Sequence, residues 1–175
     1  MNIPKKSLLS AAVLALVAAG ASQTSILDQF IKEKESSERY ELKAYQDGAR
    51  VWTVCDGKTA GVTSTTTMTK QQCDDWRKTE IGKRLTFAHK VIKKPMSEAA
   101  WAGFGSFCWN VGNAGCERST AAGLINKGKQ ADGCTAMLNW RYITRDGLKV
   151  DCSQPNPYCS GLWDRRLGEY QLCQL

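Results

Sequence analysis

Eight cysteines constrain the fold of this 175-residue chain more than any other feature of its sequence. All of them lie after residue 50. An even number of cysteines in an exported chain is typical of disulfides formed in an oxidising compartment. A zinc site is the alternative, but the sequence has no CxxC pair and only one histidine, His89, so we expect neither a metal nor another cofactor. The cysteines are Cys55, Cys73, Cys108, Cys116, Cys134, Cys152, Cys159 and Cys173.

The N-terminus has the pattern of an export signal. Lys5 and Lys6 precede a run without charged residues from Ser7 to Ile26, and Ala19-Gly20-Ala21 would serve as a small-residue cleavage site. The run approaches the roughly 20 residues that a membrane-spanning helix needs. Because Ala, Ser and Gly fill much of it, it would bury little apolar area in a bilayer. Residues 1–25 are therefore expected to be a cleaved signal peptide or a weak anchor.

The charge of the chain limits its partners. The net charge is +7, and residues 1–25 contain two lysines and no acid, so the rest carries +5 (22 basic minus 17 acidic residues). A basic body suits an anionic partner such as nucleic acid, a membrane surface or an acidic polysaccharide. Export to the periplasm or an extracellular space argues against nucleic acid, and no nucleic-acid motif is present. The length predicts one domain, which we expect to be monomeric.

The remaining pattern predicts an α+β fold. Residues Ser25 to Ala44 have loosely helical spacing of apolar side chains, whereas Tyr45 to Thr67 combine turn signals with strand formers and predict two or three short antiparallel strands. Thr69-Lys70-Gln71-Gln72 resembles a capping box that opens a helix reaching about Lys93. Further helices are expected from Ser97 onward. The prediction is a small sheet lobe, a linking helix and a helical lobe.

The stretch at the boundary of the first helix and the sheet has the residues that glycoside hydrolysis requires. Glu38 could protonate a leaving oxygen, Asp47 could stabilise charge or act as a base, and Thr53 could position water on the opposite face of the sugar. Most carboxylates are ordinary solvated groups, and this is the alternative for each acid taken singly. Three other glutamates lie close by in the sequence: Glu33, Glu35 and Glu41.

Three ordered segments extend this pattern over most of residues 35–173. They are ERYELKAYQDGARVWTVCDGKTAG, WAGFGSFCWNVGNAGCERSTAAGLINKG and GLWDRRLGEYQLC. Together they resemble the phage-type lysozymes of glycoside hydrolase family 24, in which Glu, eight residues, Asp or Cys, five residues and Thr form the catalytic triad. Glu38, Asp47 and Thr53 have that spacing. The chain departs from the family at Arg39, where the family has Gly, and at Asp56-Gly57-Lys58, where it often has Gly-His.

The resemblance implies a lysozyme-like fold with a small antiparallel β lobe and a larger helical lobe joined by a long helix. An N-terminal hydrophobic helix would precede a catalytic domain of residues 26–175. It implies an inverting muramidase, an endolysin that cleaves the β-1,4 bond between N-acetylmuramic acid and N-acetylglucosamine in peptidoglycan, with Glu38 as general acid, for host cell lysis. It also implies that Trp109, Asn110 and Ser119 line the cleft, with core packing an equal alternative for Trp109. Arg165 and Arg166 could bind the peptide stem as part of the substrate-binding set, or could instead pair with Asp164 and Glu169.

The resemblance has consequences for both the N-terminus and the disulfides. Residues 8–24 resemble a signal-arrest-release segment, which tethers an endolysin to the inner membrane after export and then frees it into the periplasm. A secreted wall-binding or antibacterial effector module with a cleaved signal peptide is the alternative. Short loops favour Cys108–Cys116 and Cys152–Cys159, and the family layout implies Cys55–Cys73 and Cys134–Cys173.

Overall fold

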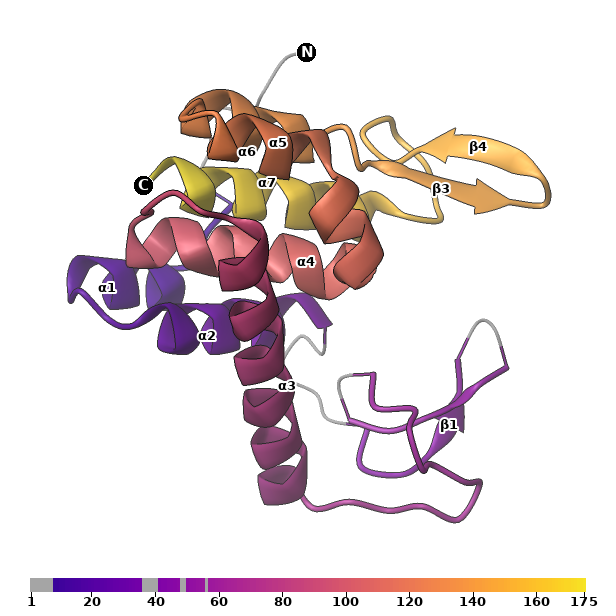
Figure 1. The fold of residues 1–175 in the computed structure, drawn as a ribbon. Coiled ribbons are helices and arrows are strands. Elements are labelled where there is room, and N and C mark those ends of the chain that lie inside the picture. Colours follow the sequence, from indigo (N-terminus) through magenta and orange to yellow (C-terminus); the bar gives the residue numbers. More distant parts are fainter. Residues whose placement is uncertain (1–7, 36–40, 48–49, 56) are drawn as a thin grey trace.

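The computed structural model describes residues 8–35, 41–47, 50–55 and 57–175. These residues form seven helices and two separate two-stranded antiparallel sheets (Figure 1). In chain order the elements are α1 (Ala11–Ala18), α2 (Gln23–Glu35), β1 (Tyr45–Gln46), β2 (Trp52–Thr53), α3 (Lys70–Val91), α4 (Glu98–Arg118), α5 (Thr120–Asn126), α6 (Gln130–Met137), β3 (Tyr142–Arg145), β4 (Leu148–Asp151) and α7 (Ser160–Gln174).

Helix α4 is the centre of the helical body. It packs against α2, α3 and α7, and every residue from Ala99 to Cys108 is buried, as expected for a helix covered on all sides. Small residues make this close packing feasible. A Cβ atom added at Gly103 would lie 2.7 Å from the carbonyl oxygen of Glu169 in α7. The helix is interrupted at Gly112, whose φ of 75° is not helical.

Helix α3 links the helical body to the first sheet. Thr69 and Gln72 form the capping box predicted from the sequence, with the Thr69 side chain accepting from the Gln72 backbone N–H and the Gln72 side chain accepting in return. The helix ends at Val91, two residues before the predicted end at Lys93. In Figure 1, α3 extends away from the other helices, and the segment that contains β1 lies beside its N-terminal part.

The predicted helix over Ser25–Ala44 is confirmed as far as Glu35, the last residue of α2, and is wrong for residues 41–44, which are not helical. The backbone groups beyond residue 41 instead bond with residues far along the chain: Ala44 N–H donates to Thr66 O, and Met68 N–H donates to Leu42 O. These partners are absent from the local sequence window. The first sheet pairs Tyr45 with Thr53 and Gln46 with Trp52, and we call the described residues between 41 and 69 the β lobe.

Four disulfides join the eight cysteines in the pairs expected above. Cys55–Cys73 fastens the β lobe to α3 and Cys134–Cys173 joins α6 to the end of α7. The other two close short loops, Cys108–Cys116 within α4 and Cys152–Cys159 after β4. Each bridge is expected to stabilise the fold by about 2–4 kcal/mol. No cysteine is free.

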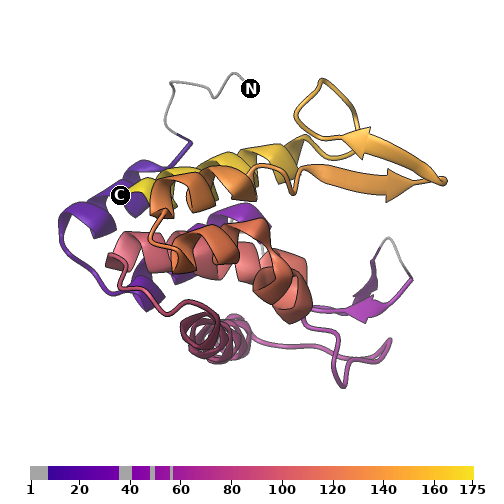
Figure 2. The ribbon, with the colours of Figure 1, turned by 45° about the horizontal axis from the view of Figure 1, so that its top comes forward.

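The second sheet was not predicted from the sequence. Strands β3 and β4 form a hairpin that projects from the helical body (Figure 2). Its turn consists of Asp146 and Gly147, both with positive φ (51° and 77°), which is the geometry that Asp-Gly favours in a two-residue hairpin. The Asp-Gly step could have revealed this hairpin, but the helices expected throughout this region obscured it.

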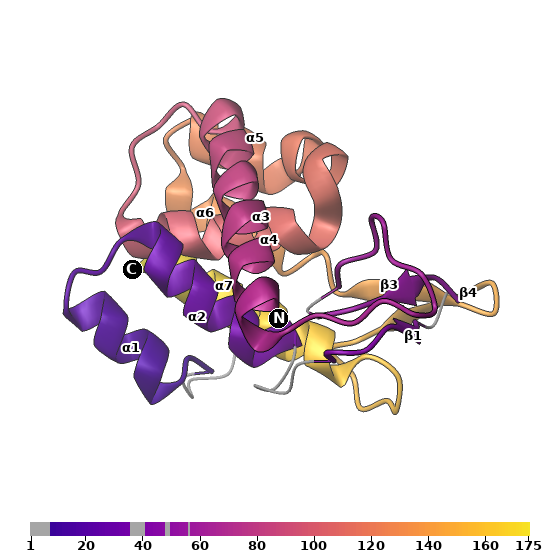
Figure 3. The ribbon, with the colours of Figure 1, turned by 90° about the horizontal axis from the view of Figure 1, so that it is seen from below.

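The hydrophobic N-terminal segment folds onto the helical body. Figure 3 shows α1 beside α2, and Leu9 and Val13 are buried in the same cluster as Phe30. Polar contacts accompany this packing: Leu8 N–H donates to Gln171 Oε1 (2.8 Å), and the Ser10 hydroxyl donates to Glu33 (2.7 Å). Within the part of the chain that the structure describes, no helix has both the length and the apolarity to cross a membrane.

The contact between α4 and α7 generates a stability prediction. Gly103→Ala places a methyl group within 2.9 Å of α7 backbone atoms, so we expect it to lower the free energy of unfolding by about 1–3 kcal/mol. Gly123→Ala is the matched control, because its Cβ would meet nothing within 4 Å and alanine favours a helix by up to about 1 kcal/mol. Urea unfolding with disulfides intact measures both. Equal stability of Gly103→Ala and wild type would contradict this packing.

Candidate active site

A pocket of about 390 Å³ lies where the β lobe, α2, α3 and α4 meet. The described residues that line it come from four segments: Glu35 at the end of α2, Gly57–Ala60 in the β lobe, Trp76, Glu80 and Arg84 in α3, and Trp109 in α4. The pocket is therefore assembled from segments that are far apart in the sequence. Its charged groups are of both signs, which suits a ligand with polar and ionic groups.

One face of α3 supplies three of the lining residues. Trp76, Glu80 and Arg84 follow each other at intervals of four residues and so share one side of the helix. Trp76 meets Trp109 edge to face, with ring centroids 6.1 Å apart and an interplanar angle of 70°. Two indole rings give this wall of the pocket broad apolar surfaces with polar N–H groups at their edges. Sugar rings, which have apolar C–H faces and polar rims, suit such a wall.

Glu35 is held in the pocket by two donors. Its Oε1 accepts hydrogen bonds from Arg165 Nη1 at 2.7 Å and from the Trp109 indole Nε1 at 3.1 Å. The Glu35 side chain is 27% exposed, whereas Arg165 is buried. Burial lowers the pKa of the neighbouring Lys34, an effect that the carboxylates of Asp164 and Glu33 partly oppose. Among the glutamates near the start of the β lobe, Glu35 had no distinguishing feature in the sequence.

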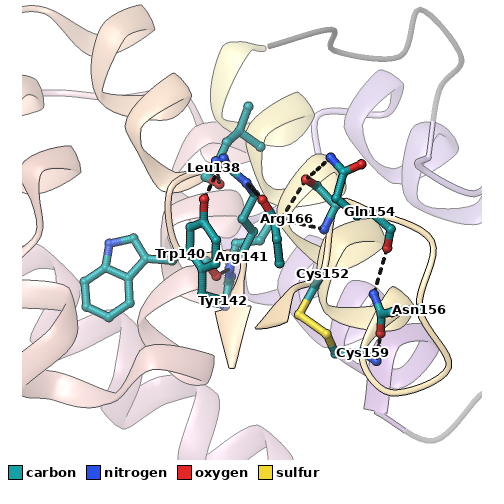
Figure 4. A network of polar contacts seen from close by, with 11 residues as sticks. Leu138, Trp140, Arg141, Tyr142, Cys152, Gln154, Asn156, Cys159 and Arg166 are labelled. Carbon is teal, nitrogen blue, oxygen red and sulfur yellow. Dashed lines mark hydrogen bonds and ion pairs between the residues drawn. A yellow bond between two sulfur atoms is a disulfide. The ribbon is translucent and has the colours of Figure 1, made fainter. Parts of the chain in front are cut away.

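A buried ionic network lies behind Glu35. Glu169 in α7 accepts from the Ser106 hydroxyl (2.7 Å), from Arg165 Nε (3.2 Å) and from Arg166 Nη1. Arg166 also donates to Asn110 Oδ1 and, through Nε, to the Trp140 carbonyl at 3.1 Å. Figure 4 shows Arg166 near Trp140 at the base of the β3–β4 hairpin. Arg166 is 0% exposed, so in this structure it braces the pocket wall and does not line the pocket.

The other predicted substrate-binding residues differ in position. Trp109 lines the pocket. Asn110 is exposed, is not among the lining residues, and accepts from Arg166. Ser119 is buried, accepts from Ala122 N–H and donates to the Cys116 carbonyl, so it caps α5. A serine that precedes a helix satisfies free backbone N–H groups in this way, which explains its position away from the pocket.

The three predicted catalytic residues are only partly described. Glu38 lies outside the described residues. Asp47 follows β1, and its Oδ1 accepts from the Val51 backbone N–H at 2.9 Å, which closes the turn between β1 and β2. Thr53 is 3% exposed, and its hydroxyl donates to the Val51 carbonyl at 3.0 Å. Asp47 and Thr53 thus both bond to the backbone of Val51, but neither is among the described residues that line the pocket.

Sequence reasoning missed most of the lining residues. The four-residue spacing of Trp76, Glu80 and Arg84 was a signal for one helix face, but nothing local indicates that this face meets Trp109 more than 20 residues later. Glu35 follows Leu27 and Ile31 at the same spacing, and both of those residues are buried. Among the described residues, no three His, Cys, Asp or Glu side chains gather as they would around a metal ion.

The family model described as phage lysozyme matches residues 35–169. The chain is 41% identical over 163 residues to a "SAR-endolysin" of Escherichia phage 933W, covering 90% of this chain and 88% of that protein. It is 39% identical over 173 residues to a "Probable prophage lysozyme" of Escherichia coli K12, covering 95% and 93%.

Solved structures share the fold. An endolysin from Escherichia coli O157:H7 phage FAHEc1 superposes with a TM-score of 0.72 at 26% identity, over 83% of this chain and 89% of the other. The active form of the P1 phage endolysin Lyz superposes with a TM-score of 0.68 at 22% identity, over 96% and 95%. The predicted lysozyme-like architecture is confirmed at this level. The β3–β4 hairpin was not part of that prediction.

The buried network generates the second stability prediction. Glu169→Ala leaves the Arg165 and Arg166 guanidiniums buried without their shared carboxylate, and we expect a loss of about 3–5 kcal/mol in the free energy of unfolding. Asp164→Ala is the matched control on the same helix, because Asp164 is exposed and such surface changes usually cost less than about 0.5 kcal/mol. Denaturant unfolding compares the two. Similar small losses would mean that Glu169 does not hold α7 in place.

Proposed function

Because this chain belongs to the phage lysozyme family and is a lysozyme-type glycoside hydrolase, we propose that it is an endolysin that hydrolyses peptidoglycan to lyse its host. The bond cleaved is the β-1,4 bond between N-acetylmuramic acid and N-acetylglucosamine. The observation that carries this proposal is the pocket with two tryptophans and two glutamates on its wall, in a chain that matches the family over residues 35–169.

The proposed reaction is hydrolysis with inversion. A glutamic acid at the end of α2 or just after it donates a proton to the glycosidic oxygen, and the bond from that oxygen to C1 of the sugar breaks. Water adds to C1 from the opposite face and gives up a proton to a base. Asp47 is proposed as this base or as a charge stabiliser, and Thr53 as the residue that positions water. The family spacing selects Glu38 as the acid, and Glu35, which lines the pocket, is the competing candidate.

The proposed binding surface is the tryptophan wall with its flanking cations. Trp76 and Trp109 offer apolar faces to sugar rings. Lys58 and Arg84 flank them in the pocket and suit the carboxylates of wall peptides and of muramic acid. Asn110, Ser119 and Arg166 are proposed to act on this surface indirectly, since Ser119 and Arg166 are buried and Asn110 binds Arg166.

The N-terminal segment is proposed to tether the enzyme to the inner membrane after export and then to release it, intact, into the periplasm. Relatives whose sequences are 41% identical to this chain are named SAR-endolysins. Leu9 and Val13 are buried in the body, and the Leu8 N–H donates to Gln171. Cleavage after Ala21 would remove all three contacts. This favours retention of the segment over the alternative of a secreted effector module with a cleaved signal peptide.

The hydrolysis proposal predicts the product. Full-length released protein should liberate reducing ends with the muramic acid residue at the new terminus, and the first product should carry the α anomer, because inversion converts the β bond. A reducing-end assay on purified peptidoglycan, with nuclear magnetic resonance of early product, measures both. Absence of reducing ends would reject the muramidase, whereas the β anomer as first product would reject only inversion.

The tether predicts an effect of apolarity on release. Gly20→Leu adds a large apolar side chain to the N-terminal run. It also opposes the turn at Gly20, whose φ of 67° suits glycine. A larger fraction of the protein should therefore stay in the membrane, and lysis should be delayed. Gly61→Leu is the matched control, since Gly61 has a similar φ of 72° and open surroundings but lies in the β lobe.

Membrane fractionation and N-terminal sequencing test this prediction. A periplasmic wild-type protein that begins at Ser22, and that never passes through a membrane-bound full-length form, would contradict the tether and leave the cleaved signal peptide.

A further inference from the structure

We propose that a patch of five exposed lysines docks this enzyme on anionic phospholipid at the surface of the inner membrane. The inference rests on the export proposed above and does not depend on the hydrolysis. The patch lies where the end of α3 meets the turn between α5 and α6, and none of its residues is among the described residues that line the pocket. We call it the lysine patch, and its members are Lys90, Lys93, Lys94, Lys127 and Lys129.

Two stretches without acidic residues meet in the lysine patch. One comprises residues 81–97 and the other residues 118–131. Asn126 joins them, because its Oδ1 accepts from the Lys93 backbone N–H at 2.7 Å and its Nδ2 donates to the Val91 carbonyl at 2.9 Å. The end of α3 and the turn after α5 are therefore fixed side by side, and their lysines share one surface.

The turn between α5 and α6 has a hydrogen-bonded backbone. Gly128 has a φ of 76°, a conformation that suits glycine, and its N–H donates to the Ile125 carbonyl at 2.8 Å. The Lys129 N–H donates to the Leu124 carbonyl at 3.0 Å. Lys127 and Lys129 flank this glycine and are both exposed, so the turn presents two cations beside those of α3.

The protein does not neutralise the lysine patch. Within the part of the chain that the structure describes, no ion pair involves any of the five ammonium groups. Residues 26–175 contain 22 basic and 17 acidic residues, so the rest of this body has 17 of each once the five lysines are set aside. The patch therefore carries a charge equal to the whole excess of the body, and an anionic partner would complement it.

The composition of the patch favours phospholipid over the glycan of the wall. A lysine ammonium is a compact point charge that suits phosphate, and each lysine near an anionic membrane surface strengthens binding about fivefold. Sugar rings need apolar or aromatic faces to stack on. In residues 86–97 and 126–130 no large hydrophobic side chain is exposed, so the lysine patch has charge without such a face.

The N-terminal segment joins the body at the edge of the lysine patch. The Oε1 of Gln23, the first residue of α2, lies 3.0 Å from the Nε2 of His89, which directly precedes Lys90. The Gln23 backbone N–H donates to Glu98, four positions after Lys94. When residues 8–24 are in the bilayer, as proposed above, Gln23 lies near its surface, and the lysine patch then lies beside the lipid headgroups.

Docking through the lysine patch leaves the pocket accessible. Trp76 in the pocket precedes Lys90 by 14 positions, which corresponds to about 21 Å along a helix. Figures 1 and 3 show β1 on the opposite side of the helical body from α1. An enzyme held by the membrane end of the body therefore keeps the β lobe and the pocket directed away from the lipid, toward the wall.

The test measures binding of the full-length released protein to lipid vesicles by sedimentation. Wild type should bind vesicles of phosphatidylethanolamine and phosphatidylglycerol. This binding should be lost when the salt concentration rises from about 0.1 M to about 1 M, which shortens the Debye length to about 3 Å. Vesicles of phosphatidylcholine alone should bind much less protein, because they have no net negative charge. Equal binding to both lipids would overturn the proposal and assign the binding to the apolar N-terminal segment.

Variants that remove charge locate the docking surface. The triple variant Lys90→Gln, Lys93→Gln, Lys127→Gln should bind anionic vesicles about 100-fold more weakly, at about fivefold for each lysine. The matched control removes three exposed lysines from the β lobe, α3 and the β3–β4 hairpin and should lose less than about threefold: Lys43→Gln, Lys78→Gln, Lys149→Gln. Equal losses in the two triple variants would show that net charge alone drives binding and would overturn the docking surface.

Two further measurements separate this inference from its alternatives. Both triple variants should keep wild-type activity on purified peptidoglycan without lipid, since none of the six lysines is among the described residues that line the pocket. A patch variant that loses binding to insoluble peptidoglycan, yet binds anionic vesicles as wild type does, would overturn phospholipid as the partner and assign the patch to the wall. A wild-type protein that binds anionic vesicles but releases no reducing ends would reject only the proposed hydrolysis.

Discussion

The buried carboxylate of Glu169 is the interaction on which the rest of this structure depends. It accepts from Ser106 in α4 and from both Arg165 and Arg166 within α7. A charged group is buried at a high cost in free energy unless its partners satisfy it, so these contacts fix the mutual position of the two helices. One carboxylate cannot balance two guanidiniums. Glu35, at the pocket end of Arg165, supplies the second negative charge and thereby ties α2 to the same network.

The pocket inherits its geometry from this centre and from two further restraints. Because Gly103 has no side chain, α4 and α7 approach so closely that a methyl group at this position would not fit between them. The Cys55–Cys73 disulfide holds the β lobe against α3, which brings Lys58 and Thr59 opposite Trp76. The pocket is assembled from four segments. It needs such restraints because no single helix or strand contains enough of the lining residues to position the others. The Trp76 and Trp109 side chains and the Glu35 carboxylate are therefore placed by the packing of α2, α3 and α4.

The N-terminal segment is proposed to be a membrane anchor, and in this structure it packs against the helical body. The composition that weakens it as an anchor, with many Ala, Ser and Gly residues, also lets it fold as a short helix against the body. Val13 and Leu9 fill space beside Phe30, and Gly168 leaves room for the Phe30 ring, since a Cβ there would lie 2.7 Å from it. Burial in protein can thus replace burial in lipid, with a similar gain for each apolar group removed from water.

The sequence by itself determined the features that depend on neighbouring residues or on composition. The Thr69 capping box, the start of α4 at Ser97 and the short-loop disulfides follow from local chemistry, and three ordered motifs were enough to predict the family. Local patterns failed where distant partners decide. Residues 42–44 continue a helical pattern yet bond to Thr66 and Met68, and Asp146-Gly147 indicated a hairpin that was not predicted.

Only the tertiary structure showed that Glu35, Trp76 and Trp109 line one pocket. Glu35 and Glu38 are alike as side chains, and spacing along the chain favours Glu38. The position of Glu35 depends on the rotation of α2, which is set by Leu27 and Ile31 in the core, and on Arg165, which lies 130 residues away. Sequence spacing gives the separation of residues along the backbone, whereas a site requires side chains that are close in space. The packing of the buried helix faces decides which distant residues become neighbours.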